Sequence, residues 1–300
     1  MTNLQLPLPN YPPARWRLLL SPHADGPTNM AVDEAILNAV AEGHSPPTLR
    51  FFGWAPPCFS LGYAQPVADV DLERLRDLGW DWVRRPTGGR AILHTDELTY
   101  SVIAPMGEPR VLGGVIESYR QLSAGLTRGV ELLGLAVRAD RKHAPVASHQ
   151  SPVIRDQLSV ISRQPPAANP ICFEVPSNYE ITANGKKLLG SAQVRKRGVV
   201  LQHGTLPLTG DVARICEALT VESEAERARL RARVHQRATT AAEVLGREVR
   251  WEEAAEALTR GFAEALSLTF ESAPLTPREL ELTAKLREEK YAAEGWNYRV

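Results

Sequence analysis

The chain of 300 residues lacks most of the features that assign a protein to a specialised class. Its 35 Lys and Arg residues equal its 35 Asp and Glu residues, so its formal net charge is zero, and aromatic residues make up only 6%. A neutral chain with few aromatic side chains gives no sign of a nucleic-acid partner or an anionic membrane partner. No stretch approaches the roughly 20 consecutive apolar residues of a membrane-spanning helix.

Cysteine is also scarce, which argues against a disulfide scaffold. The three cysteines, Cys58, Cys172 and Cys216, are far apart, and none belongs to a C-x-x-C pair. This spacing argues against a structural zinc site and fits a reducing compartment. The first sixteen residues are rich in proline and contain no apolar run typical of a secretory signal. We therefore expect a cytoplasmic protein.

Composition divides the chain into three parts. Residues 1–14 are proline-rich and are expected to form an arm, and residues 15–210 are expected to form an α/β catalytic domain. Residues 138–168 interrupt this domain with a polar, proline-rich stretch that predicts a long loop. Residues 211–300 are mostly helical in pattern, so the expected fold class is α/β (α+β) with a small helical C-terminal region.

Local patterns place the main elements. An Asn29 cap predicts a helix ending at Gly43, and Asn184-Gly185 predicts a hairpin turn. Thr276 begins a capping box with proline at the first helical position. The remaining predicted strands are 16–20, 49–54, 58–61, 82–85, 97–104, 179–183 and 198–203, and the remaining predicted helices are 72–78, 115–133, 221–237 and 251–266.

Two segments place glycines beside basic residues, RRPTGGRAILH at 84–94 and NGKKLLGSAQ at 184–193. Glycine allows a positive φ angle or a close approach of the backbone to a ligand, and free N–H groups beside cations suit a carbonyl, carboxylate or phosphate. An isolated TGG sequence is more typical of a plain turn. Two such segments in one chain, with a cysteine shortly before the second, indicate acyl transfer.

These segments resemble the biotin/lipoate protein ligase superfamily, and five further stretches share the resemblance. They are NMAVDEAIL, DELTYSV, ICFEVPSNYEI, the extension of the second segment to QVRKRGVVLQHGTL, and the terminal KYAAEGWNYRV. The similarity runs from about residue 15 to 300 and is greatest to the LipM-type octanoyltransferases. Members of this type move an octanoyl group from acyl carrier protein to a lysine of the glycine-cleavage H protein. The resemblance implies a mixed β-sheet flanked by helices.

The resemblance assigns two catalytic residues, Cys172 and Lys187. A cysteine thiolate attacks a thioester readily, and a nearby cation favours the thiolate; the alternative for Cys172 is a buried packing residue, as we expect for Cys58 and Cys216. Lys187 would orient the acyl carbonyl and stabilise developing negative charge. Strand alternation places Lys186 and Lys187 on opposite faces, but without the resemblance the residues do not show which of them faces the pocket.

The substrate-binding residues that the resemblance implies come from both glycine segments. His94 is either a general base or a hydrogen-bonded structural residue, and for His203 we favour the structural role. The basic groups at 84–85 and 195–197 are either a docking surface for an acidic carrier protein or solvated hairpin ends. The complete set is Arg85, Thr87, Gly88, Gly89, Arg90 and His94 in the first segment, and Gly190, Ser191, Ala192, His203 and Gly204 in and after the second.

The favoured function is an octanoyltransferase that works through a thioester on Cys172, with no metal and no nucleotide cofactor. Its expected partners are octanoyl-acyl carrier protein and a lipoyl-domain acceptor, either the glycine-cleavage H protein or an E2 subunit. Two alternatives remain, an ATP-dependent lipoate–protein ligase and an octanoyl amidotransferase between lipoyl domains. A non-catalytic module that binds these partners is less consistent with the presence of both Cys172 and Lys187.

Overall fold

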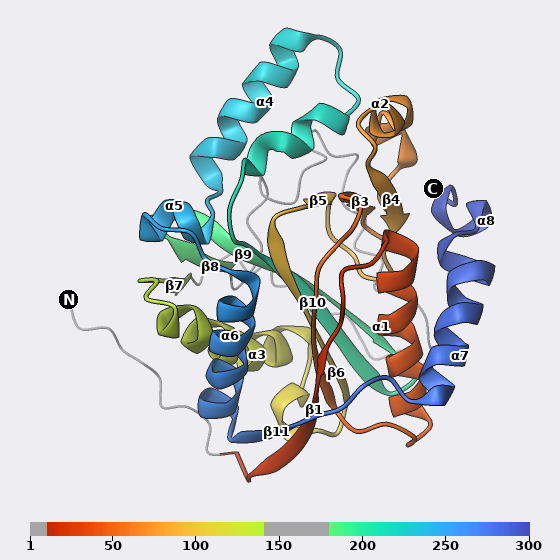
Figure 1. The fold of residues 1–300 in the computed structure, drawn as a ribbon, viewed down its shortest axis with the longest axis vertical. Helices are drawn as coiled ribbons and strands as arrows, with labels where there is room; N and C mark the ends of the chain where they lie inside the picture. Colours follow the sequence, from red (N-terminus) through yellow and green to blue (C-terminus); the bar gives the residue numbers. More distant parts are fainter. Residues whose placement is uncertain (1–10, 141–179) are drawn as a thin grey trace, which may run out of the picture.

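An eight-stranded mixed β-sheet organises the chain in a computed structural model that describes residues 11–140 and 180–300 (Figure 1). The strand order is β11-β1-β2-β6-β10-β9-β8-β7. β1 runs parallel to both β2 and β11, whereas β6, β10, β9, β8 and β7 pair antiparallel. The strands are β1 (Ala14–Leu20), β2 (Thr48–Phe52), β6 (Glu97–Pro105), β7 (Arg138–Asp140), β8 (Glu180–Ala183), β9 (Lys186–Lys196), β10 (Val199–Pro207) and β11 (Leu268–Ser272).

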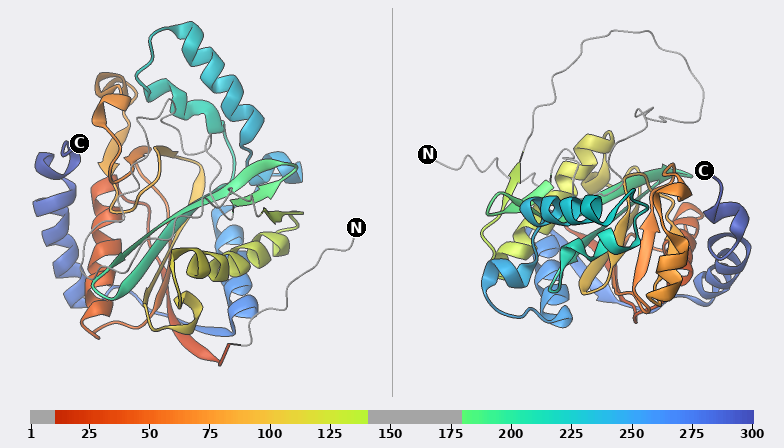
Figure 2. Two further views of the ribbon diagram at one scale, coloured as in Figure 1. Left: turned by 180° about the vertical axis from the view of Figure 1, so that it is seen from behind. Right: turned by 90° about the horizontal axis from the view of Figure 1, so that it is seen from above.

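Helices cover both faces of this sheet, as the resemblance implied. Along β6, Val102 and Ala104 join the core formed with α3 and α6, whereas Ile103 joins the core formed with α1. Figure 2 shows α1 and α7 on one side of the sheet and α3 and α6 on the other. The helices are α1 (Gly26–Ala41), α2 (Leu72–Asp77), α3 (Val115–Leu132), α4 (Glu224–Arg237), α5 (Ala241–Leu245), α6 (Trp251–Leu266), α7 (Pro277–Leu286) and α8 (Glu294–Asn297).

A second, three-stranded sheet lies at one end of the main sheet. It consists of β3 (Cys58–Leu61), β4 (Asp81–Arg84) and β5 (Ile92–His94), in the order β4-β3-β5. Its apolar face packs against α4 and the 3₁₀ segment η4 (Val212–Ala218). Cys216 is fully buried in this core, and Cys58 is fully buried in a separate core with Met30 and Ala31 of α1, so both pack as expected.

Several elements of the structure differ from the local predictions. The first helix begins at Gly26 rather than after Asn29, because the Asp25 carboxylate accepts a hydrogen bond from the backbone N–H of Thr28 at 2.7 Å and thereby caps it. The strand β11 was not predicted in the C-terminal region. Residues 138–140 form β7 instead of the start of a loop, and the rest of the predicted loop, 141–168, lies outside the described residues.

The C-terminal region packs on the rest of the chain through several elements. β11 extends the main sheet beside β1, and α6 lies against α3 at a contact where a Cβ atom on Gly261 would approach the backbone nitrogen of Gly129 to 2.2 Å. The predicted capping box at Thr276 is confirmed at the start of α7. Among the helices of residues 11–140 and 180–300, none has the length and apolar character needed to cross a membrane.

Candidate acyl-binding site

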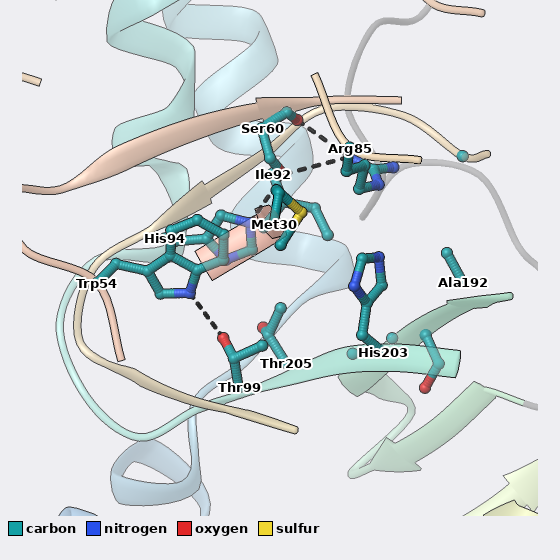
Figure 3. A pocket seen from close by; sticks show the side chains of 14 residues that line it. Met30, Trp54, Ser60, Arg85, Ile92, His94, Thr99, Ala192, His203 and Thr205 are labelled. Carbon is teal, nitrogen blue, oxygen red and sulfur yellow. Dashed lines mark hydrogen bonds between the residues drawn. The ribbon is translucent and has the colours of Figure 1, made fainter. Parts of the chain in front are cut away.

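A pocket of about 460 Å³, its open mouth included, lies where the small sheet meets the main sheet (Figure 3). The main sheet contributes residues of β6, β9 and β10, the small sheet contributes residues of β3 and β5, and α1 contributes Met30. The lining is formed by Met30, Trp54, Ser60, Arg85, Gly89, Ile92, His94, Thr99, Gly190, Ser191, Ala192, His203, Gly204 and Thr205.

The first glycine segment follows β4 and forms one rim of the pocket. Arg85 is buried and its guanidinium donates hydrogen bonds to the carbonyl oxygens of Gly88 at 2.8 Å and Arg90 at 2.7 Å, so it fixes the loop from inside. Gly89 has a φ angle of 92°, a region that favours glycine. The Gly89 carbonyl packs closely against Gly62, because a Cβ atom added to Gly62 would lie 1.9 Å from the Gly89 carbonyl oxygen. The loop is therefore held in one backbone conformation.

Two stacked rings form one wall of the pocket. The Trp54 indole lies on the His94 imidazole with a centroid separation of 4.0 Å and an angle of 12° between the ring planes. Both ring nitrogens of His94 are occupied, one by Ser60 Oγ at 2.8 Å and the other by Glu97 Oε1 at 2.6 Å. The indole N–H donates to Thr99 Oγ1 at 2.8 Å. Because the ring nitrogens of both residues are satisfied by these bonds, the stacked pair is rigid and offers an apolar ring face to a ligand.

A second histidine, His203, connects the glycine loop to the main sheet. Its Nε2 lies 2.7 Å from Thr87 Oγ1, and its Nδ1 lies 3.3 Å from Asp33 Oδ2. Burial lowers the pKa of His203, and the neighbouring Asp33 only partly offsets this effect. His203 is therefore neutral near pH 7, which suits a ring that donates to Asp33 and accepts from Thr87. This arrangement agrees with the structural role favoured for His203.

The carboxylate behind His203 is fixed by other charges. Asp33 pairs with Arg50 at 2.7 Å and accepts a hydrogen bond from Ser101 at 2.8 Å. Burial alone would raise the pKa of Asp33, but Arg50 and His203 outweigh it and hold the pKa below its usual value. The ionised carboxylate thus anchors α1, β2, β6 and β10 beneath the pocket.

Lys187 lies at the pocket end that is formed by β9. The hairpin turn has φ angles of 50° at Asn184 and 76° at Gly185, as the predicted asparagine–glycine turn requires. Lys186 faces outward and pairs with Glu243 at 3.0 Å, whereas Lys187 is buried, so the two lysines do point to opposite faces. A Cβ atom on Gly190, which lines the pocket, would lie 2.9 Å from Cε and 3.3 Å from Nζ of Lys187. The buried amine therefore borders the pocket.

The predicted site residues divide into three groups. Cys172 lies outside the described residues, so its distance from Lys187 stays a prediction. Thr87, Gly88 and Arg90 support the pocket rim through the contacts given above but do not line it. The residues that do line it are Arg85, Gly89, His94, Gly190, Ser191, Ala192, His203 and Gly204.

The two basic groups considered for docking differ in burial, since Arg84 and Arg85 are buried whereas Lys196 and Arg197 are exposed. Arg84 and Arg85 are buried and donate to backbone carbonyls, so this pair does not form a docking surface. Arg195 donates to the Gly113 and Gly114 carbonyls before α3. Lys196 pairs with Glu34 and Arg197 with Glu42, at 2.8 Å and 3.1 Å.

Sequence reasoning missed much of the pocket wall. Trp54 and Ser60 come from segments read only as strands, and Asp33 lies within NMAVDEAIL without having been singled out. An acidic residue on the mostly apolar helix α1 was a usable signal, because a buried carboxylate needs partners. Within residues 11–140 and 180–300, no group of three or more His, Cys, Asp or Glu side chains is arranged to hold a metal ion.

The fold and the pocket together define a lipoate-ligase-like catalytic domain. The fold is similar to that of an archaeal lipoate protein ligase from Thermoplasma acidophilum, with a TM-score of 0.75 and 24% identity over 95% of this chain and 96% of that one. It is also similar to lipoate-protein ligase A solved with ATP, with a TM-score of 0.73 and 25% identity over 95% and 99% of the two chains.

Residues 25–263 match the family described as the lipoyl protein ligase A/B catalytic domain, and the chain belongs to this family. Two curated relatives are named octanoyltransferase LipM. The relative from Symbiobacterium thermophilum is 44% identical and that from Kyrpidia tusciae is 43% identical, and each alignment covers 95% of this chain and 98% of the relative.

Proposed function

We propose that this chain is an octanoyltransferase of lipoate biosynthesis that takes octanoyl from acyl carrier protein, holds it as a thioester on Cys172 and transfers it to a lysine of a lipoyl-domain protein. Near full-length similarity to proteins named octanoyltransferase LipM supports octanoyl transfer as the activity and an acyltransferase as the class of enzyme. The donor, the thioester and the acceptor are the finer parts of the proposal.

The observation that carries the proposal is a largely apolar pocket with a buried amine at one end. Figure 3 places Ala192 on one side of the pocket and the stacked Trp54 and His94 on the other, with His203 between them. Gly190, which borders Lys187, belongs to the same strand as Ala192. An acyl chain with its carbonyl near Lys187 would extend its tail toward the two rings. At ~0.8 kcal/mol per buried CH₂, six methylenes provide roughly 5 kcal/mol of binding free energy.

Two acyl transfers make up the proposed reaction. The Cys172 thiolate attacks the carbonyl carbon of the octanoyl thioester; a new C–S bond forms, and the carrier thiolate leaves and takes a proton. The neutral amine of the acceptor lysine then attacks the octanoyl-cysteine. An amide bond forms, the Cys172 thiolate leaves, and the proton of the attacking amine is released. Each step exchanges one acyl bond for another, so neither an oxidant nor ATP is required.

Lys187 has a defined task in both steps. Each tetrahedral intermediate carries negative charge on the former carbonyl oxygen, and a buried ammonium next to the pocket stabilises that charge more strongly than an exposed one would. The same positive charge favours the thiolate form of a nearby cysteine. Lys186, which faces Glu243 on the opposite side of the strand, is a natural comparison for this role.

The test is a transfer assay without ATP. The purified chain is incubated with octanoyl-acyl carrier protein and an unmodified lipoyl-domain acceptor, and octanoyl-lysine is measured by mass spectrometry, with glycine-cleavage H protein and an E2 lipoyl domain compared as acceptors. We expect transfer that is abolished by Cys172→Ala and retained by Cys216→Ala, which removes a buried thiol that does not line the pocket.

Two other outcomes would replace the proposal. Product that requires ATP and free octanoate or lipoate, and that survives Cys172→Ala, would identify a ligase. Transfer from octanoylated H protein but not from octanoyl-acyl carrier protein would identify an amidotransferase.

A further inference from the structure

One buried hydroxyl group on the pocket wall has no hydrogen-bond partner. Thr205 of β10 is buried and lines the pocket, and its Oγ1 is unpartnered within the part of the chain that the structure describes. Thr99 pairs with Thr205 across the two strands, and Figure 3 shows the two side chains beside each other. The Thr99 hydroxyl already accepts from the Trp54 indole and donates to Glu97 Oε1 at 2.6 Å. Thr205 is therefore the hydroxyl of this pair that a ligand can engage.

A buried hydroxyl without a partner costs folding free energy, because the group loses its hydrogen bonds to water and gains none in return. The large majority of buried polar side chains are hydrogen-bonded, so an exception calls for an explanation. An acyl chain offers only one strong acceptor, its carbonyl oxygen. The position of Thr205 relative to the Lys187 amine therefore decides whether its hydroxyl is placed for that oxygen.

Strand pairing places Thr205 next to the glycine that borders Lys187. Thr205 of β10 lies directly opposite Gly190 of β9, so their Cβ positions are on one face of the sheet and about 5 Å apart. A Cβ atom on Gly190 would in turn lie 3.3 Å from Lys187 Nζ. The Thr205 hydroxyl and the Lys187 amine thus approach the same part of the pocket from neighbouring strands.

An irregularity in β9 explains how Lys187 reaches that face. Strict alternation would put residues 187 and 190 on opposite faces of the sheet. The register of β8 against β9 shifts at one point, as in a β-bulge, and Leu188 and Leu189 both join the core formed with α3 and α6. Lys187 and Gly190 therefore share the pocket face. Bulges re-aim side chains and are frequent beside active sites.

We propose that the Thr205 hydroxyl donates a hydrogen bond to the acyl carbonyl oxygen and, together with the Lys187 ammonium, stabilises the negative charge that develops there. This inference rests on the proposed function and adds a second catalytic group to it. In each tetrahedral intermediate the carbonyl oxygen becomes an oxyanion, and Thr205 keeps its proton throughout while its O–H group donates to that oxygen. A fixed donor in a buried pocket acts more strongly than the same donor in water.

The experiment replaces the hydroxyl with a methyl group of similar size in Thr205→Val and keeps the hydroxyl in Thr205→Ser. The matched control is Thr127→Val in α3, because Thr127 Oγ1 is also buried without a partner among the described residues but does not line the pocket. Loading of Cys172 from octanoyl-acyl carrier protein is followed by rapid-quench mass spectrometry, and the thermal midpoint of each protein is measured.

We expect Thr205→Val to lower the rate of loading about 100-fold, as is usual for the loss of one donor to an oxyanion, with little change in the KM for the donor. Thr205→Ser should keep most of the wild-type rate. Both valine variants should be at least as stable as the wild type, because each removes an unsatisfied buried hydroxyl. A loss of rate without a loss of stability separates catalysis from packing.

The acyl-enzyme gives a second readout. The carbonyl of octanoyl-Cys172, labelled with a heavy carbon isotope, has an infrared stretch whose frequency falls when the carbonyl oxygen accepts a hydrogen bond. This stretch should move to higher frequency in Thr205→Val and stay near the wild-type frequency in Thr205→Ser and Thr127→Val.

Three results would overturn the inference: equal loading rates in Thr205→Val and Thr127→Val, an unchanged carbonyl stretch in Thr205→Val, or a loss of rate in Thr205→Ser as large as in Thr205→Val. A wild-type protein that forms no octanoyl-Cys172 would contradict the proposed function by itself. Titration with octanamide, which has the same chain and carbonyl but needs no cysteine, then decides the inference separately. Weaker binding of octanamide to Thr205→Val than to Thr127→Val would support it, and equal binding or no binding would reject it.

Discussion

Gly190→Ala should displace the Lys187 amine and leave the stability of the fold nearly unchanged. Gly190 lies in β9, and a methyl group there would lie 2.9 Å from Cε and 3.3 Å from Nζ of Lys187. The first distance is shorter than ordinary van der Waals contact between carbon atoms. The neighbouring atoms belong to the end of a flexible side chain, so the amine moves more readily than the backbone.

The expected magnitude follows from this geometry. A displacement of a catalytic group by about 1 Å can cost about 100-fold in rate, and loss of one charge-stabilising donor costs a comparable factor. We therefore expect kcat for octanoyl transfer to fall roughly 100-fold. Stability should change little, because alanine at a strand position loses less backbone entropy than glycine on folding, and this gain offsets part of the crowding.

The assay measures kcat and the thermal midpoint for Gly190→Ala beside Gly107→Ala, whose added methyl group would meet no atom within 4 Å. If Lys187→Met inactivates the protein but Gly190→Ala keeps the wild-type rate, the reasoning is refuted. A rate loss that merely follows unfolding would refute it too. Gly204→Ala should instead destabilise the protein, because its methyl group would approach the Gly190 carbonyl oxygen to 2.3 Å.

Two further predictions concern the pocket walls. Trp54→Leu removes one of the stacked rings, so the ratio of kcat/KM for decanoyl over octanoyl donors should rise roughly tenfold, because each additional methylene that the pocket accommodates gains ~0.8 kcal/mol. The control Trp16→Leu, in the core away from the pocket, should leave this ratio unchanged. An unchanged ratio in Trp54→Leu would show that the stacked rings do not limit the length of the acyl chain. Burial lowers the pKa of His203, so the unfolded chain binds more protons than the folded one below about pH 6.5, and stability should fall as the pH falls through this range. Urea unfolding at pH 7.0 and 5.5 should show a smaller loss for His203→Gln than for the wild type; equal losses would contradict this prediction.

Local chemistry made several elements of the fold predictable. The turn at Asn184-Gly185 and the capping box at Thr276 depend on residues that are adjacent or three positions apart, and both are present in the structure. The amphipathic pattern of α3 placed its ends correctly to within one residue. Strand β11 escaped prediction because its pairing with β1 joins residues that are more than 250 positions apart, and only one of its side chains is buried.

In the candidate site, too, the features set by neighbouring residues were predictable and those that depend on distant segments were not. Glycine and basic residues in short segments pointed to the pocket rim, and strand alternation separated Lys186 from Lys187. The stacked pair of Trp54 and His94 and the partnership of Asp33 with His203 depend on distant strands meeting, so spacing did not reveal them. The basic segments could not be ranked as docking candidates because sequence does not show which cations are buried: Arg84 and Arg85 are enclosed, whereas Lys196 and Arg197 are exposed.

The most direct test of octanoyl transfer through Cys172 is the intact mass of the protein after a brief reaction with octanoyl-acyl carrier protein, with no acceptor present. The account predicts a gain of one octanoyl group, mapped to the peptide that contains Cys172, removed by hydroxylamine and absent from Cys172→Ala. It also predicts much slower loading in Lys187→Met than in Lys186→Met. A wild-type protein that never gains the octanoyl group but still modifies its acceptor, or a Cys172→Ala variant that transfers at the normal rate, would contradict it.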